Sequence, residues 1–89
     1  MTTGTASIDF GTGKTDTTVA VSAAGIAGGS MVEAWIVPAT TASNTADNHW
    51  VDDLQVMAGS INAGVGFTIY AHCKTGKAHG VFNIGWVHT

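Results

Sequence analysis

Short runs of alternating apolar and polar residues, separated by glycine-containing breaks, extend along almost the whole chain. In the run from Thr5 to Phe10, for example, Ala6, Ile8 and Phe10 fall on one face. A period of two residues is that of a β-strand with one buried face. Several such runs with turn residues between them predict an all-β sandwich or barrel.

The residue types agree with strands. The chain has 89 residues, of which 28 are Val, Ile or Thr and one is Leu. Side chains branched at Cβ pack well on a pleated surface and lower helix propensity. This length suits one small domain, so we expect residues 1–89 to form a single unit.

Three further runs are expected to be strands. Thr17 to Val21 places Val19 and Val21 inward. Met31 to Val37 is almost continuously apolar and predicts a central strand, closed by a proline. Val51 to Ala58 continues the alternation, whereas the ten small or polar residues from Ala39 to Asn48 predict a loop long enough to form an interface.

The C-terminal part of the chain predicts an antiparallel β-hairpin with its loop at Lys74 to Lys77. In the register that matches apolar residues, one face pairs Ile69 with Phe82, Phe67 with Ile84 and Val65 with Trp86. The other face pairs Thr68 with Asn83, Tyr70 with Val81 and His72 with His79. A shift of one residue would place Asn83 opposite Phe67, which disfavours that alternative.

Charge and hydropathy exclude several classes of function. The net charge is -3 and only 10% of residues are charged, so the clustered Lys and Arg of a nucleic-acid interface are missing. No apolar run approaches the ~20 residues that cross a bilayer, and we expect no membrane partner. The N-terminal residues lack the features of a signal peptide, which predicts synthesis in a cytoplasm.

The single cysteine, Cys73, has no partner for an internal disulfide. We expect it to be a small core residue, not a nucleophile. A small chain without a disulfide or metal commonly gains stability by oligomerisation, so the sequence predicts a homo-oligomer.

Two motifs suggest chemistry and fail on inspection. The segment Gly11 to Thr15 ends in Gly-Lys-Thr, but a phosphate-binding loop requires a glycine where Ile8 stands. His49 lies among three aspartates, an arrangement that suits a general base or an ion site, yet the spacing matches no known ligand pattern. We therefore expect an acidic loop there, and no catalytic residue, cofactor or metal.

His72 and His79, facing each other in the predicted hairpin, could hold an ion or respond to pH. Two ligands make only half of a zinc site, and Lys74 and Lys77 would oppose a cation. A solvated or interface pair is the preferred interpretation.

The three tryptophans have different expected roles. Trp86 is expected in the core, and Trp35 lies in a run that suits either the interior or a subunit contact. Trp50 follows the polar loop and is the one most suited to an exposed contact, although burial is the ordinary fate of tryptophan.

Several segments together resemble short structural proteins of tailed bacteriophages and prophages. They are VEAWIVP (32–38), ADNH (46–49), AGSINAGVGFTIY (58–70) and NIGWV (83–87). The resemblance spans nearly the whole chain and implies a small β-sandwich, jelly-roll-like, that decorates or cements a capsid or belongs to a fibre. It brings no catalytic residues.

The leading hypothesis is a non-enzymatic capsid decoration or cement protein, made in the host bacterial cytoplasm and located in the virion. It would form a homo-oligomer, specifically a trimer, and would bind the major capsid protein or another virion protein. The alternative is a receptor- or carbohydrate-binding module of a head or tail fibre, with His49, Trp50 and Tyr70 as contacts. A small hydrolase is a third possibility, for which no nucleophile can be named.

Overall fold

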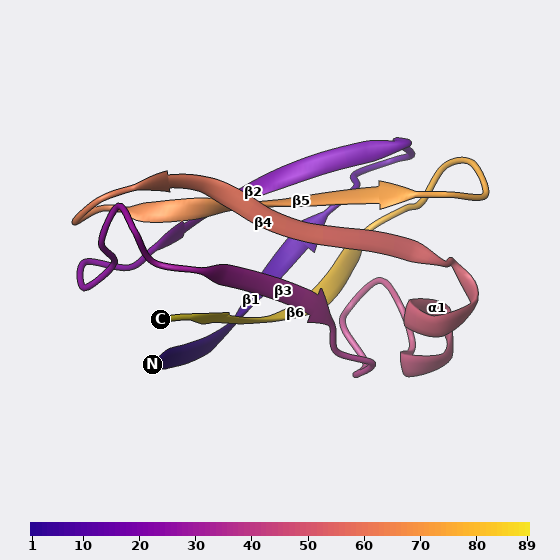
Figure 1. The fold of residues 1–89 in the computed structure, drawn as a ribbon. Coiled ribbons are helices and arrows are strands. Elements are labelled where there is room, and N and C mark those ends of the chain that lie inside the picture. Colours follow the sequence, from indigo (N-terminus) through magenta and orange to yellow (C-terminus); the bar gives the residue numbers. More distant parts are fainter.

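The computed structural model describes all 89 residues, which form six strands and one short helix (Figure 1). In chain order these are β1 (Thr2–Asp9), β2 (Asp16–Ser22), β3 (Val32–Ile36), α1 (Ala46–Val51), β4 (Leu54–Asn62), β5 (Gly66–Cys73) and β6 (Val81–His88). The predicted all-β class is confirmed. The six-residue helix α1 lacks the length and apolar character needed to cross a membrane.

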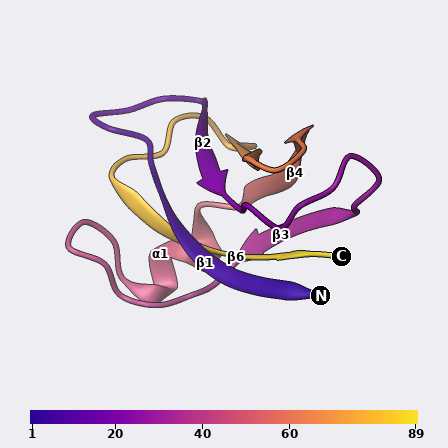
Figure 2. The same ribbon diagram turned by 90° about the vertical axis from the view of Figure 1, so that its left-hand side faces the viewer.

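The strands form two three-stranded antiparallel sheets that pack face to face, as Figure 2 shows end on. One sheet has the order β1-β6-β3 and the other β2-β5-β4. β1 pairs with β6 and β2 with β5, while β3 packs over β4 across the interior. The first three strands are thus matched in reverse order with the last three, an arrangement that fits the expected jelly-roll-like sandwich.

Alternate residues of every strand point into the interior, as the two-residue period predicts. Phe67 of β5 meets Trp86 of β6 edge to face, with ring centroids 5.3 Å apart. Phe10 and Phe82 make a similar contact at 5.6 Å. The predicted inward positions of Ile8, Val19 and Val21, and the core position of Trp86, are confirmed.

The predicted C-terminal hairpin is wrong. β5 and β6 are the middle strands of different sheets, so they face each other across the core and share no ladder. Their connection crosses between the sheets, where Ala78 exchanges two backbone hydrogen bonds with Lys14. The prediction failed because apolar residues alternate in the same way on two strands that oppose each other across a sandwich as on two neighbouring strands of one sheet. Val65, which was predicted to pair with Trp86, lies in a turn and is 60% exposed.

Two further expectations need correction. β3 is an edge strand, not a central one. Trp35 lies on the outer face of β3, packs over Gly85 of β6 and stays 44% exposed. This packing explains why the sequence of β3 is apolar on both faces. The expected loop 39–48 ends early, because Thr45 caps α1 by accepting a hydrogen bond from the Asn48 amide.

Gly66 is the one glycine of β5, and it should be sensitive to substitution because a Cβ there would collide with the Val21 carbonyl oxygen of β2. We expect Gly66→Ala to lower the free energy of unfolding by about 3 kcal/mol, since backbone must shift. Gly59→Ala is the matched control on β4, where a Cβ meets nothing within 4 Å. Urea denaturation of both variants measures the difference; equal effects would contradict the close approach.

Candidate functional site

The five residues expected to contact a partner or ligand do not gather at one place. His49 and Trp50 lie on α1, Tyr70 and His72 on the outer face of β5, and His79 in the β5–β6 connection. They therefore define several separate surfaces.

His49 has a structural role. It is 2% exposed and its ring packs edge to face on Phe82, with centroids 5.0 Å apart. The Nδ1–H donates to the Thr45 carbonyl at 2.8 Å, and Nε2 accepts the backbone N–H of Asn83 at 2.9 Å. Since one partner only accepts and the other only donates, the ring is held as the neutral Nδ1–H tautomer.

This hydrogen bond completes the ladder between β3 and β6. Val37 donates its N–H to the Asn83 carbonyl, after which Pro38 follows and β3 has ended. The N–H of Asn83 is then without a strand partner, and the imidazole takes the place of a backbone carbonyl. His49, which lies among aspartates in the sequence, therefore uses both ring nitrogens for hydrogen bonds that support the fold.

Replacing this histidine should destabilise the protein. His49→Phe keeps a ring against Phe82 but removes the acceptor of the Asn83 amide, which costs about 1–3 kcal/mol. The neighbouring Trp50→Ala, at a side chain that is 80% exposed, should change stability by no more than about 0.5 kcal/mol. Urea denaturation compares them; equal stabilities would show that the hydrogen bond contributes nothing.

Trp50 is the most exposed of the three tryptophans, as the sequence suggested. It borders a shallow hollow of about 300 Å³ whose apolar walls are Ile36, Pro38 and Leu54. Asp53, held at a positive φ of 50°, supplies the charged side chain of this hollow. An exposed indole beside apolar walls is suited to a planar or apolar partner.

Tyr70 and His72 lie two residues apart on the outer face of β5. Tyr70 stands between Thr18 and Met57, and its hydroxyl hydrogen-bonds that of Ser60. His72 stands between Asp16 and Gln55. The predicted pairing of His72 with His79 is therefore wrong, since β2 and β4 occupy both sides of β5.

His79 is exposed and lies close to Gly13 of the β1–β2 connection. No group of three or more His, Cys, Asp or Glu side chains is placed to hold a metal ion. Cys73 is 3% exposed, and its thiol donates to the Asp52 carbonyl at 3.3 Å, so its predicted core position is confirmed.

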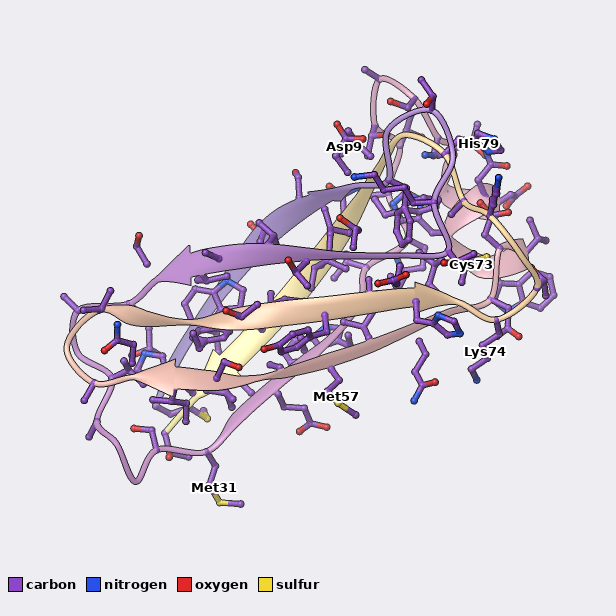
Figure 3. All side chains as sticks on the ribbon, turned by 90° about the horizontal axis from the view of Figure 1, so that it is seen from above. Asp9, Met31, Met57, Cys73, Lys74 and His79 are labelled. Carbon is purple, nitrogen blue, oxygen red and sulfur yellow. The ribbon has the colours of Figure 1, made fainter.

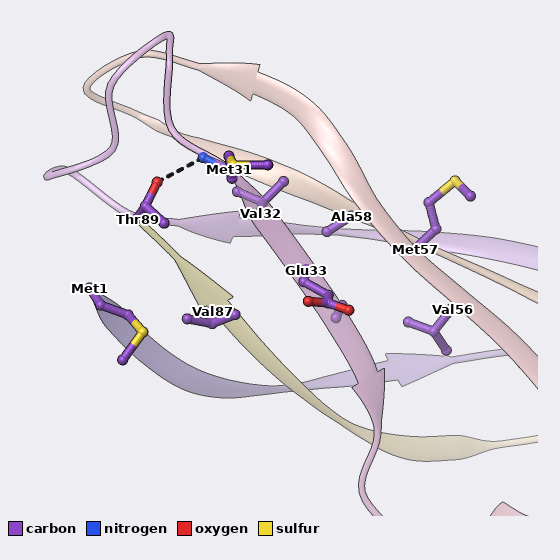
Figure 4. Close-up of a pocket in the computed structure, with 10 residues that line it drawn as sticks. Met1, Met31, Val32, Glu33, Val56, Met57, Ala58, Val87 and Thr89 are labelled. Atoms are coloured by element: carbon purple, nitrogen blue, oxygen red, sulfur yellow. Dashed lines mark hydrogen bonds between the residues drawn. The ribbon is translucent and has the colours of Figure 1, made fainter.

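The largest hollow is a groove that the sequence did not indicate. It measures about 550 Å³ and follows the edge of β3, as Figure 4 shows. Eight of its ten lining residues are hydrophobic, and Glu33 is its one charged side chain. Met1, Met31 and Met57 are 94%, 76% and 58% exposed. The signal for it was present only as isolated methionines, because folding brings together segments distant in the sequence.

The groove lies at the end of the sandwich that carries the chain termini and the β2–β3 and β4–β5 connections, here named the terminal end. Glu33 is the only charged side chain there. The other eight of the nine charged side chains lie at the opposite end; Figure 3 labels Asp9 and Lys74 there, away from Met31. They are Asp9, Lys14, Asp16, Asp47, Asp52, Asp53, Lys74 and Lys77.

Side-chain hydrogen bonds fasten the long β3–β4 connection at the charged end. Asn44 donates from Nδ2 to the carbonyls of His79 and Val81, at 2.8 and 3.0 Å. Thr41 donates its hydroxyl to the same Val81 carbonyl at 2.9 Å. The loop expected to form an interface is therefore bonded to its own chain.

Comparison of the chain with protein-family models, with curated proteins and with solved structures found no match.

Proposed function

We propose that this protein is a non-enzymatic structural component of a phage virion that decorates or cements the capsid by binding the major capsid protein or a neighbouring virion protein. The resemblance of its strand segments to phage structural proteins suggests the setting. The observation that carries the proposal is the terminal end, where Glu33 is the only charged side chain and an apolar groove is exposed.

A surface with few charged side chains is well suited to permanent contact. Burying charged side chains requires that each be paired or desolvated, and a surface without them avoids that penalty. Methionine side chains are flexible and polarisable, so Met31 and Met57 can fit an irregular partner surface. Exposed apolar patches of this kind mark interaction sites in many proteins.

The small interior gives a second reason for contact between subunits. Only 18 of 89 residues are buried in the isolated chain. A chain of this size buries a modest share of its surface alone, and contact with neighbours adds apolar burial. The protein would thus be most stable in the assembled particle and would be made in the host bacterial cytoplasm before assembly.

A charge placed in the groove should weaken attachment to the particle. We expect Met57→Glu to lower retention on purified capsids about tenfold or more, because an unpaired carboxylate would be buried at the contact. Gln55→Glu is the matched control, with the same added charge two residues away on the same face of β4. Quantitative mass spectrometry of washed particles measures retention. Absence of the protein from purified virions would overturn the proposal.

The alternative, a receptor- or carbohydrate-binding module, now rests on Trp50. His49 is buried, and Tyr70 lies on a different surface, so the set of three contacts expected from the sequence is not brought together. Trp50 remains suitable because its indole is exposed beside a hollow at the charged end.

Trp50→Ala separates the two functions. For a decoration or cement protein we expect unchanged retention on the particle and unchanged adsorption of the particle to host cells. A receptor-binding module would instead lose adsorption while staying on the particle. Adsorption assays with wild-type and Trp50→Ala particles, with Thr40→Ala as an exposed control in the preceding loop, measure the difference.

A further inference from the structure

The outer edge of β3 has free backbone hydrogen-bonding groups in a regular array. The Met31 carbonyl accepts the N–H of Thr89, and Val37 donates its N–H to the Asn83 carbonyl. The N–H and C=O groups of the odd-numbered residues of β3 therefore point toward β6. In an antiparallel ladder the residues between them point their N–H and C=O groups the other way. Val32, Ala34 and Ile36 therefore direct three N–H and three C=O groups away from the sheet.

The β3 edge is less protected than the edge beside it. β4 is interrupted by a bulge between Gly59 and Asn62, where Ser60 has a positive φ of 52°. Bulges of this kind oppose pairing with another strand. β3 pairs regularly over its whole length, contains no proline and carries one charged residue, Glu33.

We propose that β3 pairs antiparallel with β3 of a second copy of this chain, about a two-fold axis through Ala34. This register uses all five residues of the strand and opposes Val32 with Ile36 of the other copy. All the opposed even-numbered residues then exchange backbone hydrogen bonds, as the free groups require. The two three-stranded sheets become one continuous six-stranded sheet.

The charge placement favours a second copy in this register. Glu33 and Trp35 are the outward-facing residues, and centring on Ala34 puts each Glu33 beside Trp35 of the other copy. They form a pair without mutual hydrogen bonds, in which side chains are closest. A register shifted by one residue toward Glu33 would instead place the two carboxylates opposite each other, which is unfavourable.

The same axis brings the second copy to the β3 side of the groove. It runs perpendicular to the joined sheet, so the β2-β5-β4 sheets of both copies lie on the same side. The groove residues of β3, Val32 and Ala34, then lie next to the second copy, whereas Met57, on the outer face of β4 with Gln55, stays exposed to a different partner. Such a two-fold contact is self-complementary and closed. It does not depend on a role in the virion.

The mass of the wild-type protein in solution, measured by light scattering over a range of concentrations, is the first test. We expect a dimer that dissociates on dilution. Trp35→Glu places two carboxylates side by side on each half of the contact and should weaken the dimer about tenfold or more. Glu33→Lys alone should leave the dimer intact. The double variant Glu33→Lys with Trp35→Glu should restore the dimer, because residues 33 and 35 of the two copies would then carry opposite charges.

A monomer at all concentrations, a trimer, or failure of the double variant to restore the dimer would overturn the β3 pairing. Should Trp35→Glu fail to fold, Val32→Pro tests the same edge, because it removes an N–H that has no partner within the chain. Ser7→Pro on the outer edge of β1 is its control and should leave the dimer intact. In wild-type dimers of mixed isotope labelling, a contact between the Hα atoms of Glu33 and Trp35 on different copies reports the register directly. Capsid retention, measured separately, decides the proposed function whichever mass is found.

Discussion

The contact between β5 and β6 across the interior is the interaction on which the rest of the structure depends. Each is the middle strand of its sheet, and their inward side chains supply most of the large core residues, including Phe67, Ile69, Phe82 and Trp86. Every other strand is an edge strand that pairs with one of these two. A chain this short has one hydrophobic core, so the four edge strands depend on their pairing with β5 and β6 for their place in the fold.

This contact also explains how far the sequence could predict the fold. The two-residue period correctly gave the strands and their buried faces, because which face is apolar is a local property. It could not give the partner of each strand. Phe67 and Ile84 are both buried, as the pattern predicts, but they are not cross-strand neighbours, because the same alternation arises whether two strands adjoin in one sheet or oppose each other in two. The pattern could not indicate the edge position of β3 for a related reason. Trp35, on the outer face of β3, packs over Gly85 of the neighbouring strand β6, so the sequence of β3 is apolar on both faces, like that of a central strand.

The candidate site was predicted less well, because its residues bond to backbone groups, most of which are distant in the sequence. His49 looked like a chemical group among carboxylates, yet its partners are backbone groups of Thr45 and Asn83. Asn44 looked like an ordinary loop residue, yet it bonds the β3–β4 connection to the start of β6. Such contacts satisfy backbone groups where strands end, a requirement that exists only after folding. The groove was missed for the same reason, since Met1, Met31 and Met57 meet only once the sheets have formed.

The distribution of charge separates the two ends of the sandwich by what each can do. At the charged end, where eight charged side chains lie, side-chain hydrogen bonds hold the β3–β4 connection to its own chain, and water solvates the exposed charges. At the terminal end, loops of small uncharged residues surround the methionines and the free edge of β3. Net charge and peripheral charges normally keep exposed edges apart, and here the outer edge of β3 carries a single carboxylate, Glu33. Scarcity of charge alone would be a property of the whole chain, whereas its confinement to one end gives the molecule a direction, with one surface suited to solvent and the other to a neighbour.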